Sequence, residues 1–247
     1  EITLKNVTPE TLRYYEKSLL QLENMVITAV GDINEKLFEQ HIQKLEKALS
    51  KGTRFSTKLK IQEIGKDRFS SLNLQKEQVH IVLGYKGLTI NSPDRFALDV
   101  IQSVLSGQGG RLFYELRDKN SLAYTVSPIR MEGLEPGYFG TYIGCSPEKK
   151  EKAIEMMKAE LKKLTDELIK PEELERAQNY LIGQQAISLQ KKSTVCQSIL
   201  LDVVYGLPAD HTFTIIEEYK KVTAQQVRSL AQKLFSGPEV LSVVGPA

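Results

Sequence analysis

Apolar residues recur every three or four positions along several stretches of the chain, which is the spacing of a helix that buries one face. Between residues 148 and 168 this stripe consists of Ile154, Met157, Leu161, Leu164 and Leu168. Ser92 and Pro93 suit a helix start, with serine as the N-cap and proline at the first helical position. The pattern predicts helices at 8–20, 34–49, 93–106, 148–168, 171–205 with a break near Gly183 or Lys191, and 223–235.

Short runs rich in apolar and β-branched residues lie between these helices and predict strands. The predicted strands are 25–31, 78–85, 122–130, 137–145 and 239–244. Residues 51–75 are polar and show no clear period, so we expect a linker or a first edge strand there. Elements in this order favour the α+β class: an α/β sandwich with helices packed on a mostly antiparallel or mixed sheet.

The two ends of the chain resemble each other. Val7-Thr8-Pro9-Glu10-Thr11-Leu12-Arg13 precedes the apolar run 25–30 and Gly31, and Val222-Thr223-Ala224-Gln225-Gln226-Val227-Arg228 precedes the run 240–244 and Gly245. In each copy a threonine caps a short amphipathic helix, and a buried strand follows that ends at glycine.

The copies are 215 residues apart at Val7 and Val222, and 214 apart at their glycines. That period suits two homologous domains in tandem, although any threonine-capped helix before a valine-rich strand would look similar. We therefore predict that 1–50 is the tail of a preceding homologous domain, that 51–75 is a linker or first edge strand, and that 76–247 is the next domain.

Composition mainly excludes functions. The 247 residues are 41% hydrophobic and 26% charged with a net charge of +2, which is ordinary for a globular protein and too balanced for one that grips nucleic acid. Lysines on the polar side of 148–168 are typical of a solvated face. No apolar run approaches the ~18 residues of a membrane span.

Cys145 and Cys196 cannot build a disulfide framework, and this low cysteine use favours the cytoplasm.

Histidine placement argues against a metal site in this chain. His41, His80 and His211 each lack a second ligand at metal-binding spacing, and we expect them on a polar helix face, in an apolar strand and in a loop. The sequence also contains neither a Gly-x-x-x-x-Gly-Lys-Ser/Thr phosphate loop nor a Gly-x-Ser-x-Gly nucleophile elbow. Nothing points to a Ser/His/Asp triad.

Residues 107–130 carry most of the chemical information. Gly107, Gly109 and Gly110 form a loop that lacks the preceding strand of a nucleotide site, and we expect a flexible turn. A short helix from Arg111 to Arg117 follows, then a turn over 118–121 and a strand from Leu122.

Arg117 and Tyr124 flank that turn, so both side chains can project into one space. The guanidinium offers a fork of donors and the phenol offers one, which together can hold a peptide carbonyl or the oxyanion formed when water attacks it. The alternative is that Arg117 only stabilises its helix end and Tyr124 packs in the sheet.

The stretch Gly-Gly-Arg-Leu-Phe-Tyr-Glu-Leu-Arg-Asp-Lys-Asn-Ser-Leu-Ala-Tyr-Thr-Val closely resembles a motif in the second half of the M16 metallopeptidases (pitrilysin, insulinase, mitochondrial processing peptidase). Residues 24–32, Asn-Met-Val-Ile-Thr-Ala-Val-Gly-Asp, resemble the strand that closes the first domain of that family. The resemblance implies tandem homologous domains, and substrate contacts near the scissile bond by Arg117 and Tyr124.

The chain departs from the family at the catalytic motif. Family enzymes carry His-x-x-Glu-His, in which the histidines bind zinc and the glutamate is the general base, and no such pentapeptide occurs here. The resemblance therefore implies the C-terminal, non-catalytic half of a zinc endopeptidase, inactive alone, whose zinc is bound by residues outside this chain.

The expected partners are a catalytic half or subunit and an extended peptide substrate, with neither nucleic acid nor a membrane span. Two alternatives stay open: a non-catalytic scaffold or partner subunit of an M16-like heterodimer, and a free-standing peptide-binding module. Residues 1–50 would expose the apolar side of strand 25–31, so we also expect the isolated chain to self-associate.

Overall fold

The computed structural model describes residues 2–55 and 63–246, with the side chains from Thr3 onward. Contacts divide the chain into two units, residues 61–188 with 213–247 and residues 1–60 with 189–212. Part of the predicted linker, residues 56–62, lies outside the described residues. The predicted domain boundaries at 50 and 75 stay predictions.

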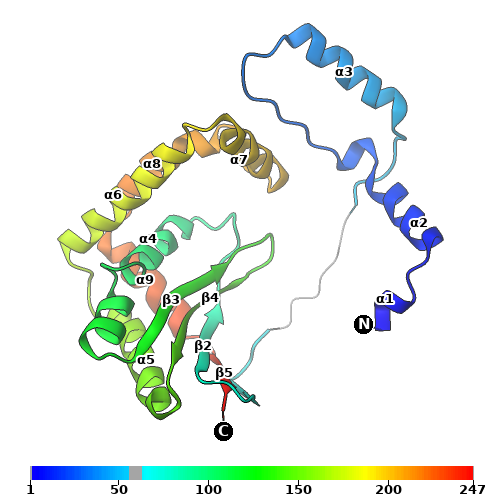
Figure 1. The fold of residues 1–247 in the computed structure, drawn as a ribbon. Coiled ribbons are helices and arrows are strands. Elements are labelled where there is room, and N and C mark those ends of the chain that lie inside the picture. The colour runs from blue at the N-terminus through cyan, green and yellow to red at the C-terminus, as the bar shows by residue number, and fades with distance from the viewer. Residues whose placement is uncertain (1, 56–62, 247) are drawn as a thin grey trace. The chain divides into compact units, whose positions relative to one another are not determined.

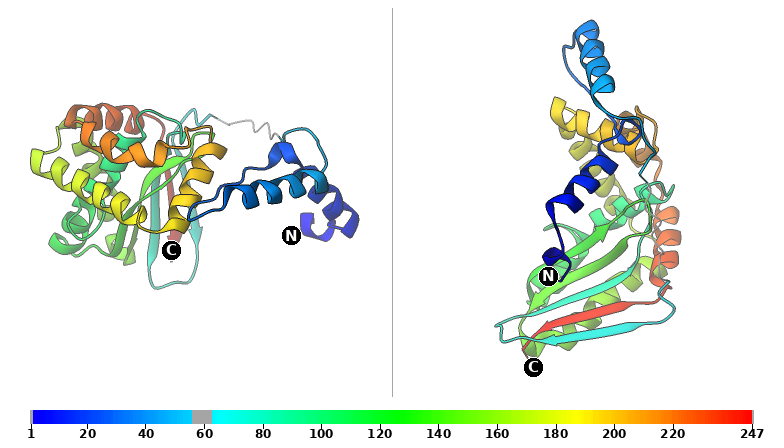
Figure 2. Two further views of the ribbon diagram at one scale, coloured as in Figure 1. Left: turned by 90° about the horizontal axis from the view of Figure 1, so that it is seen from above. Right: turned by 90° about the vertical axis from the view of Figure 1, so that its right-hand side faces the viewer.

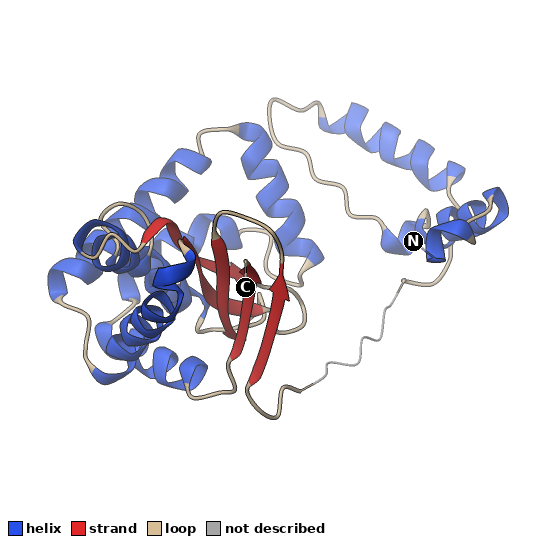
Figure 3. Cartoon of the chain, turned by 60° about the horizontal axis from the view of Figure 1, so that its bottom comes forward, coloured by secondary structure: helices blue, strands red, loops and turns tan. Residues whose placement is uncertain are grey.

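The larger unit is built on one five-stranded sheet (Figures 1 and 3). Its strands are β1 (Arg68–Asn73), β2 (Val79–Lys86), β3 (Ala123–Met131), β4 (Tyr138–Cys145) and β5 (Val240–Gly245), in the order β1-β5-β2-β4-β3. β1 pairs with β5 in parallel, and the other pairs are antiparallel. The predicted mixed sheet is therefore confirmed, and β1 is an exposed edge strand within the polar stretch 51–75.

One face of the sheet is buried beneath helices (Figure 2). Val79, Ile81, Leu83 and Tyr85 alternate along β2 and are all buried, as the period of a strand requires. The covering helices are α4 (Arg95–Leu105), α5 (Lys150–Asp166) and α9 (Ala224–Phe235). Phe139 of β4 is fully buried at their contact with the sheet.

Most predicted helices are present, with shifted ends. In the α5 stripe Met157, Leu161 and Leu164 are buried, whereas Leu168 lies beyond the helix end and is 49% exposed. The predicted N-cap Ser92 was wrong. Its hydroxyl accepts from the Asp94 N–H in a turn, and α4 begins three residues later, at Arg95.

The predicted helix 171–205 is two helices, α6 (Pro171–Ser188) and α7 (Lys192–Val204), with the break at Lys191 as expected. Between α7 and α9 the chain forms α8 (His211–Lys221), which the pattern did not predict. The expected loop position of His211 was therefore wrong. Its imidazole Nδ1 lies 2.9 Å from Asp202, whose other oxygen accepts from the Thr212 N–H and so satisfies an orphan donor of the first turn.

The smaller unit contains α1 (Ile2–Lys5), α2 (Pro9–Leu19), a 3₁₀ turn η1 (Leu22–Asn24) and α3 (Glu35–Ala48), together with α7. Neither α2 nor α3 has a buried residue.

The predicted strand 25–31 was wrong for this structure. The segment is extended but pairs with no strand in the part of the chain that is described, and a strand exists only with a neighbour that satisfies its backbone. Thr28 instead donates its hydroxyl to the carbonyl of Cys196 at 3.1 Å. Within residues 2–55 and 63–246, no helix is long and apolar enough to cross a membrane.

Candidate functional site

A π-helix positions the first predicted site residue. The helix begins at Arg111, widens into the π-helix η2 (Phe113–Lys119) and ends two residues later than predicted. Leu112 and Leu116 are fully buried and hold η2 on the core. Arg117 lies in the last turn with its side chain in solvent, where a cation is favoured by the helix dipole.

The turn after η2 reverses the chain tightly. Ser121 adopts a left-handed conformation with φ of 49°, and its N–H donates to the Arg117 carbonyl at 2.9 Å. The Leu122 N–H donates to the Leu116 carbonyl at 2.8 Å. These two bonds cap the helix much as a Schellman motif does, and they place the start of β3 beside the last turn of η2.

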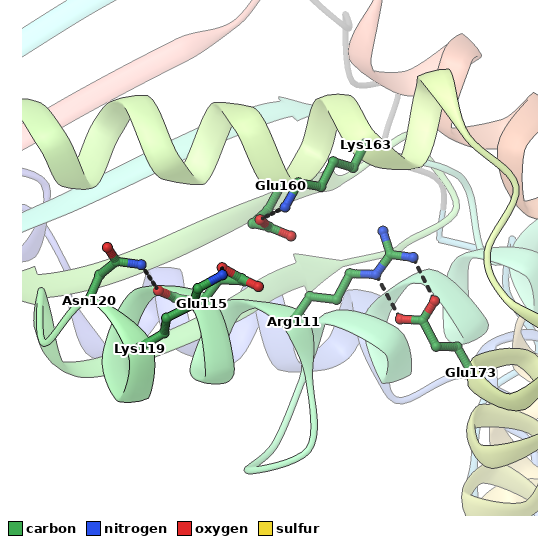
Figure 4. A network of polar contacts seen from close by, with 7 residues as sticks. All are labelled: Arg111, Glu115, Lys119, Asn120, Glu160, Lys163 and Glu173. Atoms are coloured by element: carbon green, nitrogen blue, oxygen red, sulfur yellow. Dashed lines mark hydrogen bonds and ion pairs between the residues drawn. The ribbon is translucent and has the colours of Figure 1, made fainter.

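Side chains from two elements hold the same turn. Asn120 donates to the Glu115 carbonyl at 2.7 Å, as drawn in Figure 4. Lys149, in the 3₁₀ turn η3 (Pro147–Lys149), donates to the Ser121 carbonyl at 2.8 Å. The reversal between η2 and β3 is therefore fixed by four hydrogen bonds, two from the backbone and two from side chains.

A β-bulge positions the second predicted site residue. The pairing of β3 with β4 slips between Ala123 and Thr125, so Tyr124 is an extra residue in its strand. A bulge re-aims the side chain it carries. Tyr124 is 76% exposed and does not pack in the sheet, which removes that part of the alternative interpretation.

The structure brings Arg117 and Tyr124 together. The guanidinium carbon lies 5.7 Å from the centre of the Tyr124 ring and 4.6 Å from that of Phe113. Both distances are in the range of cation–π contacts, which orient the guanidinium without using its N–H donors. Among the described residues no carboxylate pairs with Arg117. Its donors and the phenol are therefore available to a ligand.

A second arginine of the same motif has a structural role. Arg111 makes two parallel hydrogen bonds of 2.8 and 2.7 Å to the Glu173 carboxylate of α6, as Figure 4 shows. Both side chains are more than four-fifths buried. The Arg111 guanidinium holds the pKa of Glu173 below its usual range, and the same bonds raise the pKa of Arg111. Sequence reasoning missed this pair because its members are 62 residues apart.

The acidic surroundings of Arg111 extend to α5. Glu160 is 2% exposed, and one of its oxygens lies 2.6 Å from the Lys163 ammonium (Figure 4). Its charge is a further, smaller reason why the pKa of Arg111 is raised. Of the two arginines, Arg111 is thus neutralised within the fold, whereas Arg117 is not.

The glycine loop before η2 owes its shape to two of its glycines. Gly107 has φ of 74°, and a Cβ on Gly110 would lie 2.2 Å from the Ser106 carbonyl oxygen. Gly109 has open space around it. Beside the loop lies a hollow of about 220 Å³ that Arg176 and Tyr180 of α6 also line. The predicted flexibility of the loop stays a prediction.

The described residues do not offer a zinc site. Over 2–55 and 63–246, no three His, Cys, Asp or Glu side chains converge as metal ligands would. His80 Nδ1 lies 2.7 Å from the Tyr142 hydroxyl, and His211 pairs with Asp202.

Comparison with known proteins identifies the family of the chain. The model of the family described as the peptidase M16 inactive domain matches residues 6–181. The chain is 26% identical to the uncharacterized zinc protease YmxG of Bacillus subtilis over 100% of its own length and 60% of that protein. It is 27% identical to an uncharacterized zinc protease of Streptomyces coelicolor over 72% of its own length and 39% of that protein.

Solved structures show the same fold. A peptidase M16 inactive domain from Pseudomonas fluorescens matches with a TM-score of 0.89 at 21% identity, over 98% of this chain and 58% of that one. A protease from Helicobacter pylori matches with a TM-score of 0.87 at 20% identity, over 98% and 60%. The chain thus spans 39 to 60% of the length of these relatives.

Glu173→Gln is expected to lower the free energy of unfolding by about 1.5–3 kcal/mol at pH 7, since it removes a charged partner of Arg111. The pKa of Glu173 is lowered by folding, so its contribution is complete above the unfolded value of about 4.3 and is lost as pH falls through the folded one. Urea unfolding at pH 7 and pH 3 should show the difference from wild type shrinking in acid. Glu217→Gln, in an exposed pair with Lys220, is the control and should change stability by less than about 0.5 kcal/mol.

Gly110→Ala is expected to destabilise the protein by about 1–3 kcal/mol, because its methyl group would overlap the Ser106 carbonyl. Gly109→Ala should leave stability nearly unchanged. Thermal unfolding of both variants tests the pair, and equal losses would contradict this reading of the loop. Gly109→Ala is then the variant that tests the predicted flexibility of the loop. Unaltered peptidase kinetics of this variant would count against that flexibility.

Proposed function

This chain belongs to the peptidase M16 family, whose inactive domain it carries, and we propose on that basis that it is the non-catalytic, substrate-facing half of a zinc-dependent endopeptidase. Relatives named as zinc proteases support a zinc enzyme, and they are longer than this chain. The zinc and the His-x-x-Glu-His motif would belong to a catalytic half outside these 247 residues, because the described residues do not fit the metal.

The single observation that supports a substrate role is the exposed pair of Arg117 and Tyr124. The rings of Phe113 and Tyr124 hold the guanidinium carbon at 4.6 and 5.7 Å, so its planar fork of donors has a set direction. The four hydrogen bonds of the turn keep the phenol beside it. Donors fixed in advance stabilise charge that develops on a carbonyl oxygen, because they need no rearrangement during the reaction.

The substrate in this proposal is an extended peptide. Its main chain would add to a sheet edge of the catalytic half, and Arg117 and Tyr124 would contact the carbonyl of the bond to be cleaved. Neither residue would transfer a proton. Both would bind and orient the carbonyl and the oxyanion that replaces it.

Tyr124→Phe in the assembled enzyme is expected to lower kcat by about 100- to 1000-fold, because one donor to the oxyanion is lost. KM and the melting temperature should change little, since the ring and its contact with Arg117 remain. Quenched-peptide kinetics and thermal unfolding measure both. Tyr114→Phe is the matched control, because Tyr114 is an exposed tyrosine of η2 outside the ring contacts of Arg117. An unchanged kcat for Tyr124→Phe would remove Tyr124 from the mechanism.

A further inference from the structure

The hollow beside the glycine loop carries a set of polar groups separate from Arg117 and Tyr124. Its volume is about 220 Å³. It is lined by Ser103 of α4, by Ser106 and residues 107–109 of the loop, and by Arg176 and Tyr180 of α6. None of these lining residues is acidic, and Arg176 is the cation among them. The hollow is therefore a positively charged space without a carboxylate of its own.

The guanidinium of Arg176 pairs with no carboxylate among the described residues. Glu172 lies four positions earlier on α6, at a spacing that favours an ion pair, yet no such pair forms. Glu173 lies three positions earlier, but its two oxygens already accept from Arg111 at 2.8 and 2.7 Å. Arg176 thus presents an uncompensated charge and a planar fork of donors at the hollow.

Tyr180 adds a directed donor. It lies four residues after Arg176, on the same side of α6, and is 57% exposed. The side-chain amide of Gln184 donates to the Tyr180 hydroxyl at 3.2 Å. A hydroxyl that accepts from one neighbour still has its own proton to donate, and no described residue accepts this one. The phenol can therefore donate to a ligand in the hollow.

The loop contributes backbone donors. The N–H groups of Gln108 and Gly109 donate to no other backbone group in the part of the chain that the structure describes, and Gly109 has open space around it. A guanidinium fork surrounded by neutral donors matches a carboxylate, because two parallel N–H···O bonds fit the two oxygens of that group. The lining therefore favours a carboxylate over a cation or an apolar group.

We propose that this hollow binds a carboxylate of the substrate peptide, with Arg176 as its main contact and Tyr180 as a second donor. The inference rests on the proposed peptidase function and adds to it a preference for acidic peptides. The loop ends at Gly110, and seven residues of helix separate it from Arg117, a rise of about 10 Å. An extended peptide covers that distance in about three residues. The carboxylate is accordingly about three residues from the bond that is cleaved.

Matched quenched peptides test the proposal in the assembled enzyme. In one series the two peptides of a pair differ only in glutamate or glutamine, placed two, three or four residues from the cleaved bond on either side. In a second series the peptide ends at these positions in a free carboxylate or in an amide. We expect the carboxylate peptide to have a kcat/KM about 10- to 100-fold higher at one position, because a charged hydrogen bond to Arg176 is gained. The gain should lie in KM, since this remote contact is the same in the ground state and the transition state.

The two series also identify the source of the carboxylate, an acidic side chain or the end of the peptide, and either source supports the proposal. A ratio near one at every position in both series would overturn it.

Variants of Arg176 assign the preference to the hollow. Arg176→Gln should reduce the ratio to about one and leave cleavage of the glutamine peptide nearly unchanged. Arg176→Lys should retain part of the ratio, because the charge remains without the fork. Arg68→Gln, at an exposed arginine of β1 that does not line the hollow, is the matched control and should retain the full ratio. A ratio that survives Arg176→Gln would overturn the proposal.

Tyr124→Phe separates this inference from the role proposed for Arg117 and Tyr124. It should lower kcat for both peptides of a pair and leave their ratio unchanged. If kcat is unaltered while the ratio still depends on Arg176, the oxyanion role fails and the carboxylate site stands. Calorimetry with the zinc-chelated enzyme measures the same preference as a ratio of dissociation constants, without cleavage. Equal dissociation constants for the carboxylate peptide and its neutral counterpart would overturn the site.

Discussion

Burial of one face of the sheet beneath α4, α5 and α9 is the constraint on which the candidate site depends. Leu112, directly before η2, and Leu116 within it belong to the same core, and so does Leu122, directly before β3. Each end of the turn is thus tied to the core by leucines, and the residues between them have little freedom. Arg117 and Tyr124 stand in solvent next to these anchors. Arg117 and Tyr124 lie close together because the core packing on either side of the turn fixes its ends. The cation–π contact between them adds only weakly to the stability of this arrangement.

The pair also depends on two irregularities, each of which adds a residue to a regular element. A π-turn is wider than an α-turn by one residue, and a β-bulge adds one residue to a strand. Arg117 lies within the first, and the second turns Tyr124 out of the sheet. Both features are common near functional sites. Their cost in backbone regularity is offset here by the four hydrogen bonds of the turn.

The sequence pattern predicted those helices and strands whose apolar side chains are buried. The apolar run at 78–85 and the stripe of α5 predicted one strand of the sheet and one covering helix, and their apolar residues are largely buried. Neither the π-helix nor the bulge alters the hydrophobic pattern, so the site geometry could not be predicted beyond the closeness of Arg117 and Tyr124 in sequence. The Arg111–Glu173 pair was unpredictable for another reason. It joins the helical turn before η2 to α6 across 62 residues, and an ion pair produces no periodic pattern in the sequence.

The wrong strand prediction at 25–31 has a different physical meaning. Periodicity and β-branched content report what a segment can form when neighbours are present, whereas a strand exists only where another strand accepts and donates its backbone bonds. Residues 240–244 have such neighbours, whereas residues 26–30, of nearly the same sequence, have none among the residues that the structure describes. The same local sequence is thus a central strand at one end of the chain and an unpaired extended segment at the other. The difference lies in what surrounds each copy, since a strand forms only where neighbouring backbone accepts and donates its hydrogen bonds.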